Sequence, residues 1–584
     1  MRIMGVVLLT AIAVSSFFAG CAGYSIEAIA DKISTLPHAA SPLLSNQFSG
    51  YLQVGPSKYI HYIYFESERD PATDSVVWWT NGGPGCSGLL GLFTEQGPWR
   101  ASWDEVTSSP SLIRNPYSWT RTANVVFVEQ PAGVGYSYST DASALGNLND
   151  EVAATDHLVA VRMFLERFPE RKENEFYFSG ESYGGHYVPQ LTKKFLEVRN
   201  SGEANLPNLK GLIIGNPFTS FASGTVAGAL AMWGFQVVSL PLWTSFVEAS
   251  CADLQQSAIA FYQKGCFELF DKIDASGTID GKPLLNPYAI DFPVCTKDIG
   301  GVEMEKSKDE ETAQAGFLNS LGLSAQSRTM RQLAQRIRSH ISSSQRLPLT
   351  PPVASESEVG QDVAPKLPET NAKGWTAMQF APSARNSGNS RVLTDEENTS
   401  DFPMNSFGET MPTDLIRYDP CSPNYLALYL NLAEVRRALH VPSTQSLGQW
   451  SQCNDALFRN WPAQDFYADV TKLYADILLQ APDLKLLIYS GDADSVCATV
   501  GSQDWVFRVA EGAGLSIETL FAPWFVGGQK AGYITRFTDR FSFMTVHTAG
   551  HEVPAYQPAR ALSLFQGGVE GSVFSSDSSS SAKS

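Results

Sequence analysis

The stretch Glu175-Phe176-Tyr177-Phe178-Ser179-Gly180-Glu181-Ser182-Tyr183-Gly184 decides the fold class of this chain. Its first four residues are typical of a buried strand, and a helix is expected to begin near Gly185. Between the two, Gly180 and Gly184 surround Ser182 in a G-x-S-x-G pattern, which allows a sharp turn that exposes a serine hydroxyl above a sheet edge. Taken alone the pattern is weak, because glycine and serine are common in ordinary turns.

Strand-like and helical segments alternate on both sides of this turn. Strands are predicted at residues 59–65, 75–79, 124–128, 175–178, 211–214 and 485–489. A helix is predicted over residues 150–168, because apolar residues recur there at helical spacing and Pro169 ends the pattern. Strands that alternate with helices predict a mainly parallel sheet in an α/β fold.

A serine hydroxyl is a poor nucleophile until a histidine takes its proton, and an acid must orient that histidine. In α/β hydrolases these residues follow the order serine, acid, histidine. Asp492 and Asp494 come directly after the predicted strand 485–489, and His547 and His551 lie in a later loop bounded by glycine and proline. We assign Asp494 and His551 to the catalytic set, interpreting Asp492 as a turn-stabilising residue and His547 as a structural strand-end residue.

Backbone N–H groups that stabilise an oxyanion are also expected. The predicted strand 75–79 is followed by Asn81-Gly82-Gly83-Pro84-Gly85, where consecutive glycines let a backbone N–H approach a substrate carbonyl. The natural partner is the N–H of Tyr183, the residue after the nucleophile. The other interpretation of the glycine segment is a simple turn, but three spaced elements in the right order favour a catalytic centre.

Four motifs together resemble the serine carboxypeptidases. They are WTNGGPGCS at residues 79–87, GESYGGHYVP at 180–189, GDAD at 491–494 and AGHEVP at 549–554. The resemblance covers about residues 40–300 and 415–565. It implies an α/β-hydrolase fold with a mostly helical cap. It also implies an acyl-enzyme mechanism that releases C-terminal amino acids from peptides and proteins at acidic pH. The composition of residues 300–414, rich in Ser, Pro, Gln and charge, predicts a long polar insertion within the cap, which is longer than is usual in the family.

The resemblance also implies roles for single residues. These are a triad of Ser182, Asp494 and His551, an oxyanion hole at Gly83 and Tyr183, a site for the substrate's terminal carboxylate at Asn81, Glu181, Glu95 and Trp79, and a pocket for the leaving residue at Glu552 and Val496. Ionised glutamates would repel a carboxylate, whereas protonated ones can donate hydrogen bonds to it. We therefore expect peptide binding to weaken as pH rises towards neutral.

Six of the cysteines are assigned to disulfide pairs. The resemblance implies a disulfide between Cys86 and Cys453; we pair Cys251 with Cys266 and Cys295 with Cys421, although spacing alone does not determine connectivity. Cys497 is left unpaired, as a small buried apolar residue.

Five segments are expected along the chain. They are a signal peptide at 1–23, the first part of the core at 24–216, a cap region at 217–473 with a flexible polar insertion at about 300–414, the second part of the core at 474–570, and a disordered serine-rich tail at 571–584. Asn398 begins a glycosylation sequon in the insertion. The signal peptide predicts the secretory pathway, with a secreted or a vacuolar or lysosomal destination.

Composition excludes several classes of partner. A net charge of −18 argues against nucleic-acid binding, and no second long apolar run predicts a permanent membrane span. No Cys/His cluster indicates a metal, and we expect no cofactor. The expected partners are peptides or proteins with a free C-terminus, acted on by a monomer or homodimer. The alternatives are an acyltransferase of the same family and a protein that chiefly stabilises others.

Overall fold

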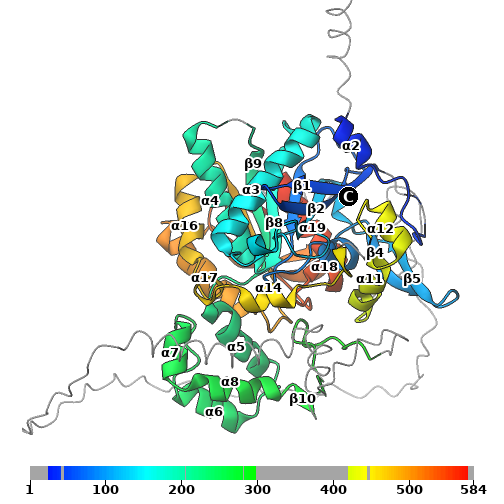
Figure 1. Ribbon diagram of the computed structural model, residues 1–584. Coiled ribbons are helices and arrows are strands. Elements are labelled where there is room, and N and C mark those ends of the chain that lie inside the picture. Colours follow the sequence, from blue (N-terminus) through cyan, green and yellow to red (C-terminus); the bar gives the residue numbers. More distant parts are fainter. Residues whose placement is uncertain are drawn as a thin grey trace, which may run out of the picture. The chain divides into compact units, whose positions relative to one another are not determined.

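The computed structural model describes residues 24–296, 418–443 and 447–575, apart from positions 41, 43, 44, 204, 280, 281 and 284. In this part of the chain, eleven strands form one mixed sheet (Figure 1). Its order is β1 (Gln47–Gln53), β2 (Lys58–Phe65), β6 (Asn124–Glu129), β3 (Val76–Thr80), β8 (Glu175–Ser182), β9 (Asn208–Pro217), β12 (Lys485–Gly491), β15 (Phe541–Val546), β14 (Gln529–Arg536) and β13 (Thr519–Val526), with β7 (Tyr138–Ser139) beside β2.

The centre of the sheet is parallel, from β6 through β3, β8, β9 and β12 to β15. Antiparallel strands flank it on both sides. The six strands predicted from the sequence occur as β2, β3, β6, β8, β9 and β12, and the predicted helix occurs as α3 (Asp150–Arg167). The α/β-hydrolase fold is therefore confirmed.

Both faces of the sheet are buried by helices. Neighbouring residues of β3 alternate, so that Trp78 enters one apolar cluster and Trp79 the other. The Trp78 cluster includes side chains of α3, α4 (Gly184–Ser201), α16 (Thr471–Gln480) and α17 (Thr499–Gly512). The Trp79 cluster includes side chains of α11 (Ser422–Leu430), α12 (Ala433–Ala438), α18 (Val553–Tyr556) and α19 (Pro558–Glu570). Burial on both faces explains why the central strands are almost continuously apolar.

Short helices make up most of the described chain between β9 and β12. They include η6 (Ala222–Val226), α5 (Ala227–Gly234), α6 (Leu240–Glu248), α7 (Ala258–Gln263), α8 (Cys266–Ala275), α14 (Asp455–Asn460) and α15 (Ala463–Phe466), with a small hairpin of β10 (Thr278–Ile279) and β11 (Lys282–Pro283). Helices α5, α6 and α7 each contact α8, and η6 and α5 contact α17 of the core. The predicted signal peptide, the insertion at 300–414 and Asn398 lie outside the described residues.

The disulfides are Cys86–Cys453, Cys251–Cys266 and Cys295–Cys421, the pairs expected from the sequence. Cys497 is free and buried. The ordered chain extends five residues into the segment predicted to be a disordered tail. Residues Ser572–Phe574 form a 3-10 helix in which Val573 and Phe574 are buried. The segment was predicted from its serine-rich composition as a whole, in which two apolar residues carry little weight. Both side chains pack in the Trp79 cluster.

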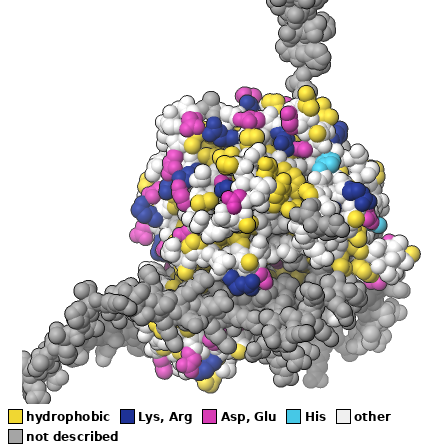
Figure 2. Space-filling model, viewed as in Figure 1, with side chains coloured by type: hydrophobic (Ala, Val, Ile, Leu, Met, Phe, Trp, Pro, Cys, Tyr) yellow, Lys and Arg dark blue, Asp and Glu magenta, His cyan; other side chains and the backbone are white. Residues whose placement is uncertain are grey.

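The described surface mixes charges of both signs. On the face shown in Figure 2, acidic and basic side chains are interspersed over the same region. This pattern gives that face no basic stripe of the kind that tracks a phosphate backbone. Within the described ranges, no helix combines the length and apolar character that a membrane span needs.

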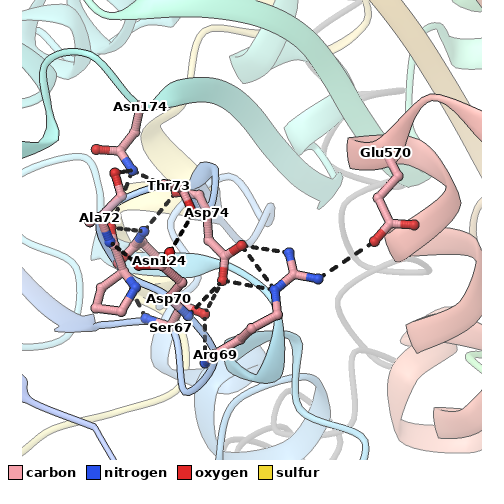
Figure 3. Close-up of polar contacts among 10 residues, drawn as sticks. Ser67, Arg69, Asp70, Ala72, Thr73, Asp74, Asn124, Asn174 and Glu570 are labelled. Carbon is pink, nitrogen blue, oxygen red and sulfur yellow. Dashed lines mark hydrogen bonds and ion pairs between the residues drawn. The ribbon is translucent and has the colours of Figure 1, made fainter.

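A polar network joins the amino ends of three neighbouring parallel strands, β3, β6 and β8 (Figure 3). The Asp74 carboxylate accepts hydrogen bonds from the Ser67 hydroxyl and from Arg69. The side-chain amides of Asn124 and Asn174 both donate to the backbone oxygen of Asp74, at 2.8 and 2.7 Å. Arg69 also lies 3.8 Å from Glu570 at the end of α19. This network secures the sheet at the edge opposite the carboxyl ends of the strands.

Replacing Asp74 by Ala is expected to lower the free energy of unfolding by about 2–4 kcal/mol, because buried donors lose their acceptor. Urea unfolding of the wild type and the variant measures the change. KM for any substrate should stay constant, since the network lies at the edge away from the candidate site. An unfolding midpoint equal to that of the wild type would show that the network adds nothing to stability.

Candidate active site

Ser182 occupies a sharp turn between β8 and α4. It is the last residue of β8 and has a φ of +59°, which is uncommon for a residue other than glycine. Such strain is characteristic of a nucleophile turn between strand and helix. The turn can form because Gly185 packs against the next strand: a Cβ there would lie 2.4 Å from the backbone oxygen of Phe218. The hydroxyl is thereby placed at the carboxyl edge of the parallel sheet.

A buried acid–histidine pair lies at the same edge. The Nδ1 atom of His551 is 2.7 Å from Oδ2 of Asp494, and both side chains are almost completely buried. The Asp494 carboxylate also accepts hydrogen bonds from the amides of Val496 and Cys497. Cys497 is buried beside the acid, and the Asp494 charge and the Ser182 hydroxyl both act on the pKa of its thiol. Asp494 is thus held in one orientation, with its charge directed at His551.

The two competing residues pair with each other instead. The Nδ1 atom of His547 lies 2.7 Å from Oδ2 of Asp492, but about half of the His547 side chain is exposed. The other Asp492 oxygen accepts the Thr548 amide, which is the turn-stabilising role expected for it. The loops after β12 and β15 are therefore joined by two aspartate–histidine pairs, and burial distinguishes the pairs.

The glycine segment after β3 lies directly against the serine turn. A Cβ at Gly82 would be 2.3 Å from the Tyr183 amide nitrogen and 2.8 Å from Cβ of Ser182. Gly83 has a φ of +109°, a conformation that favours glycine. The disulfide between Cys86 and Cys453 anchors the end of the segment. Gly82 is thus packed against the Ser182–Tyr183 turn, and Gly83 is the next residue of the segment.

Two buried glutamates and an asparagine form the next layer. The side-chain amide of Asn81 donates to Glu181 at 2.8 Å and to Glu95 at 3.3 Å. Its oxygen accepts hydrogen bonds from the Trp79 indole and the Gly91 amide, which orients the amide group towards the acids. Trp79 itself is wholly buried. Its indole N–H therefore orients Asn81 at the border of the two glutamates.

The electrostatics of this layer favour protonated carboxyls. Burial, followed by the charge of Glu552, raises the pKa of Glu95 to about 8. Burial and the neighbouring Glu95 raise the pKa of Glu181 still further above its ordinary value. The two carboxyls accept hydrogen bonds from the same Asn81 amide, so they lie close together. Two acids this close cannot both be ionised without a large cost, so the pair retains a proton at neutral pH.

His551 experiences opposing effects. Burial disfavours its charged form, but Asp494, together with Glu552 and Glu95, outweighs burial and raises the pKa of His551. Glu552 follows His551 directly and is partly exposed; burial also raises its pKa. Val496 is partly exposed as well. Burial keeps Cys497 a neutral thiol by raising its pKa, in agreement with its interpretation as an apolar residue.

Two residues beside the triad were not singled out from the sequence. The Asn216 side chain donates to Asp494 at 2.8 Å and accepts the Gly491 amide at 3.0 Å. Asn216 is near the end of the parallel strand β9, and this position could have indicated it. The backbone oxygen of Tyr288 accepts the His551 amide at 2.6 Å, and its ring packs edge-on against the imidazole. No sequence pattern marks Tyr288.

Comparison with known proteins decides the family. The family model described as serine carboxypeptidase matches residues 37–571. The chain belongs to the serine carboxypeptidase family. Mouse (Mus musculus) lysosomal protective protein is 30% identical over 542 residues, which cover 92% of each chain. Serine carboxypeptidase-like 36 of Arabidopsis thaliana is 28% identical over 537 residues, which cover 92% of this chain and 85% of that relative.

A solved structure agrees with this fold. A prohormone-processing carboxypeptidase from Saccharomyces cerevisiae matches 92% of this chain and 95% of its own, with a TM-score of 0.61. At 15% identity this match shows the shared fold alone. Family membership makes the protein a serine-type carboxypeptidase, a class of hydrolase.

Proposed function

We propose that the protein removes C-terminal amino acids one at a time from peptides, at acidic pH, with Ser182, His551 and Asp494 as its triad. The observation that carries this proposal is the buried contact between His551 and Asp494, at the sheet edge where Ser182 ends β8. The acid layer of Asn81, Glu95 and Glu181 borders Ser182, since Glu181 precedes it in β8.

The reaction follows from these positions. The Ser182 oxygen attacks the carbonyl carbon of the last peptide bond as His551 accepts the hydroxyl proton. The amides of Gly83 and Tyr183 stabilise the oxyanion. His551 then gives its proton to the departing amine, which leaves as a free amino acid. Water, deprotonated by His551, cleaves the acyl-enzyme ester and restores Ser182.

Selection of the C-terminus rests on the acid layer. The protonated carboxyl of Glu181 and the side-chain amide of Asn81 can donate hydrogen bonds to a terminal carboxylate, with Glu95 as the neighbour that shares the proton. An amidated C-terminus lacks the negative charge that these donors recognise. Glu552 and Val496, both partly exposed, are proposed to line the pocket for the leaving residue, where Glu552 would favour lysine or arginine.

The cellular setting is proposed from two observations. The name of the mouse relative places that protein in the lysosome, and the first 23 residues have the composition of a signal peptide. We infer a secretory route with a lysosomal, vacuolar or extracellular end point.

Mass spectrometry of two matched peptides, one with a free C-terminus and one amidated, tests the function at about pH 5. The wild type should shorten the free peptide stepwise and the amide far more slowly, while Ser182→Ala should shorten neither, a loss of about 10⁴-fold or more. A wild type that leaves both peptides intact but transfers an acyl group to an alcohol would replace this proposal with the acyltransferase alternative. Equal trimming of both peptides would refute selection of the C-terminus.

A further inference from the structure

One buried arginine joins the two turns that carry the acid layer and the catalytic histidine. Arg100 lies in β4 (Trp99–Asp104), which forms a hairpin with β5 (Ser109–Arg114), and only 8% of it is exposed. A single guanidinium nitrogen donates to three backbone oxygens, those of Thr94 at 2.9 Å, Ala555 at 3.1 Å and Pro554 at 3.3 Å.

These three oxygens belong to the two turns on which recognition depends. Thr94 precedes Glu95 in the π-helical turn η2 (Gly91–Glu95), a rare conformation found often at functional sites. Pro554 and Ala555 lie in α18, which follows His551 and Glu552 directly. Helix α18 has only four residues and so cannot satisfy its own carbonyls. Arg100 supplies the missing donor and holds η2 against α18, two elements that contact each other.

The positive charge of Arg100 also acts on Glu95. Its side chain interacts electrostatically with Glu95, and burial lowers the pKa of Arg100 only to about 10, so it remains charged. Other groups that act on the pKa of Glu95 are Glu552, Glu181, Asn81 and His551. The Tyr489 hydroxyl interacts electrostatically with Glu181 and Glu95. In this largely acidic group, a permanent cation favours the ionised form of Glu95.

We propose that Arg100 is a positioning residue for recognition of the terminal carboxylate: it fixes the Glu95 turn against the turn of His551 and Glu552 and places a positive charge beside Glu95. This assignment rests on the proposed function. Arg100 is placed behind the acid layer, bonded to backbone oxygens, so it acts through Glu95 and does not itself contact substrate.

Arg100→Met and Arg100→Lys separate the two contributions, with kcat and KM for a free-acid peptide measured from about pH 5 to about pH 9. In Arg100→Met we expect KM to rise about 10- to 100-fold at acidic pH, with kcat within about threefold of wild type. The increase of KM with pH should also move to higher pH, because Glu95 loses the cation that stabilises its anion. Arg100→Lys should keep the wild-type pH profile and recover most of the affinity.

Arg436→Met is the matched control. Arg436 is a buried arginine that donates to the backbone oxygen of Pro442 and packs over Tyr136, and neither of these residues belongs to the acid layer. Its loss should lower the unfolding temperature without moving the pH profile of KM.

Three results would overturn the assignment. The first is an Arg100→Met variant whose KM and pH profile match those of Arg436→Met. The second is a parallel loss of kcat and thermal stability with KM unchanged. The third applies if Arg100→Met does not fold: an Arg100→Lys variant whose KM–pH profile differs from that of the wild type. A wild type that does not distinguish free from amidated peptides refutes the proposed function instead, and the two failures are therefore distinguishable.

Discussion

Asp494→Asn is expected to lower kcat by about 10⁴-fold, whereas Asp492→Asn should leave kcat within about threefold of wild type. Both aspartates lie 2.7 Å from a histidine Nδ1 atom, so a distance alone does not separate them. Asp494 is completely buried and its partner His551 is 3% exposed, while the Asp492 pair is open to solvent. An imidazolium formed during the reaction depends on a nearby anion only where water is excluded.

The matched pair of histidines extends the test. His551→Ala should abolish turnover and His547→Ala should preserve it, with circular dichroism to show that both variants are folded. Single-turnover kinetics with an ester substrate would report acylation directly. If Asp492→Asn or His547→Ala lost activity as severely as the buried pair, the assignment of the triad would be wrong.

The parallel sheet and the positions of the catalytic candidates could be predicted from the sequence, because both depend on local patterns. The G-x-S-x-G turn and the strand before it specify where Ser182 lies, and the structure places it at the end of β8. The choice between Asp492 and Asp494 could not come from spacing, because both follow the same strand. It depends on burial, which long-range packing of Asn216 and Tyr288 around Asp494 and His551 determines.

Other features depended on contacts between distant segments. Glu95 reaches Asn81 through the π-helical turn η2, and no periodic pattern predicts such a turn. Arg100 reaches Pro554 and Ala555 across about 450 positions of chain, and its neighbours in sequence give no sign of this. Trp79 was expected at the carboxylate site, and its indole N–H donates to Asn81, a contact that the motif alone does not reveal.

KM for a free-acid peptide is expected to rise at least about tenfold between about pH 6 and about pH 9, while kcat rises or stays level over that range. Raised pKa values mean that Glu95 and Glu181 are protonated below neutral pH and lose their protons as pH increases. Each lost proton replaces a donor with an anion that repels the substrate carboxylate. With the pKa of Glu95 at about 8, the loss of affinity extends through neutral into weakly alkaline pH, above the acidic range that the family resemblance implies.

His551 limits the reaction at low pH, because only its neutral form accepts the Ser182 proton. Its raised pKa makes kcat fall as pH decreases, and kcat/KM should therefore be bell-shaped. Glu552 and Glu95 favour a proton on His551 only when they are ionised, so their protonation lets His551 stay neutral at lower pH. Glu95→Gln separates the two limbs, since its amide donates at every pH. The increase of KM with pH should become smaller, with Glu181 responsible for the rest, while the acid limb of kcat persists. A KM–pH curve unchanged by Glu95→Gln would show that another group controls binding.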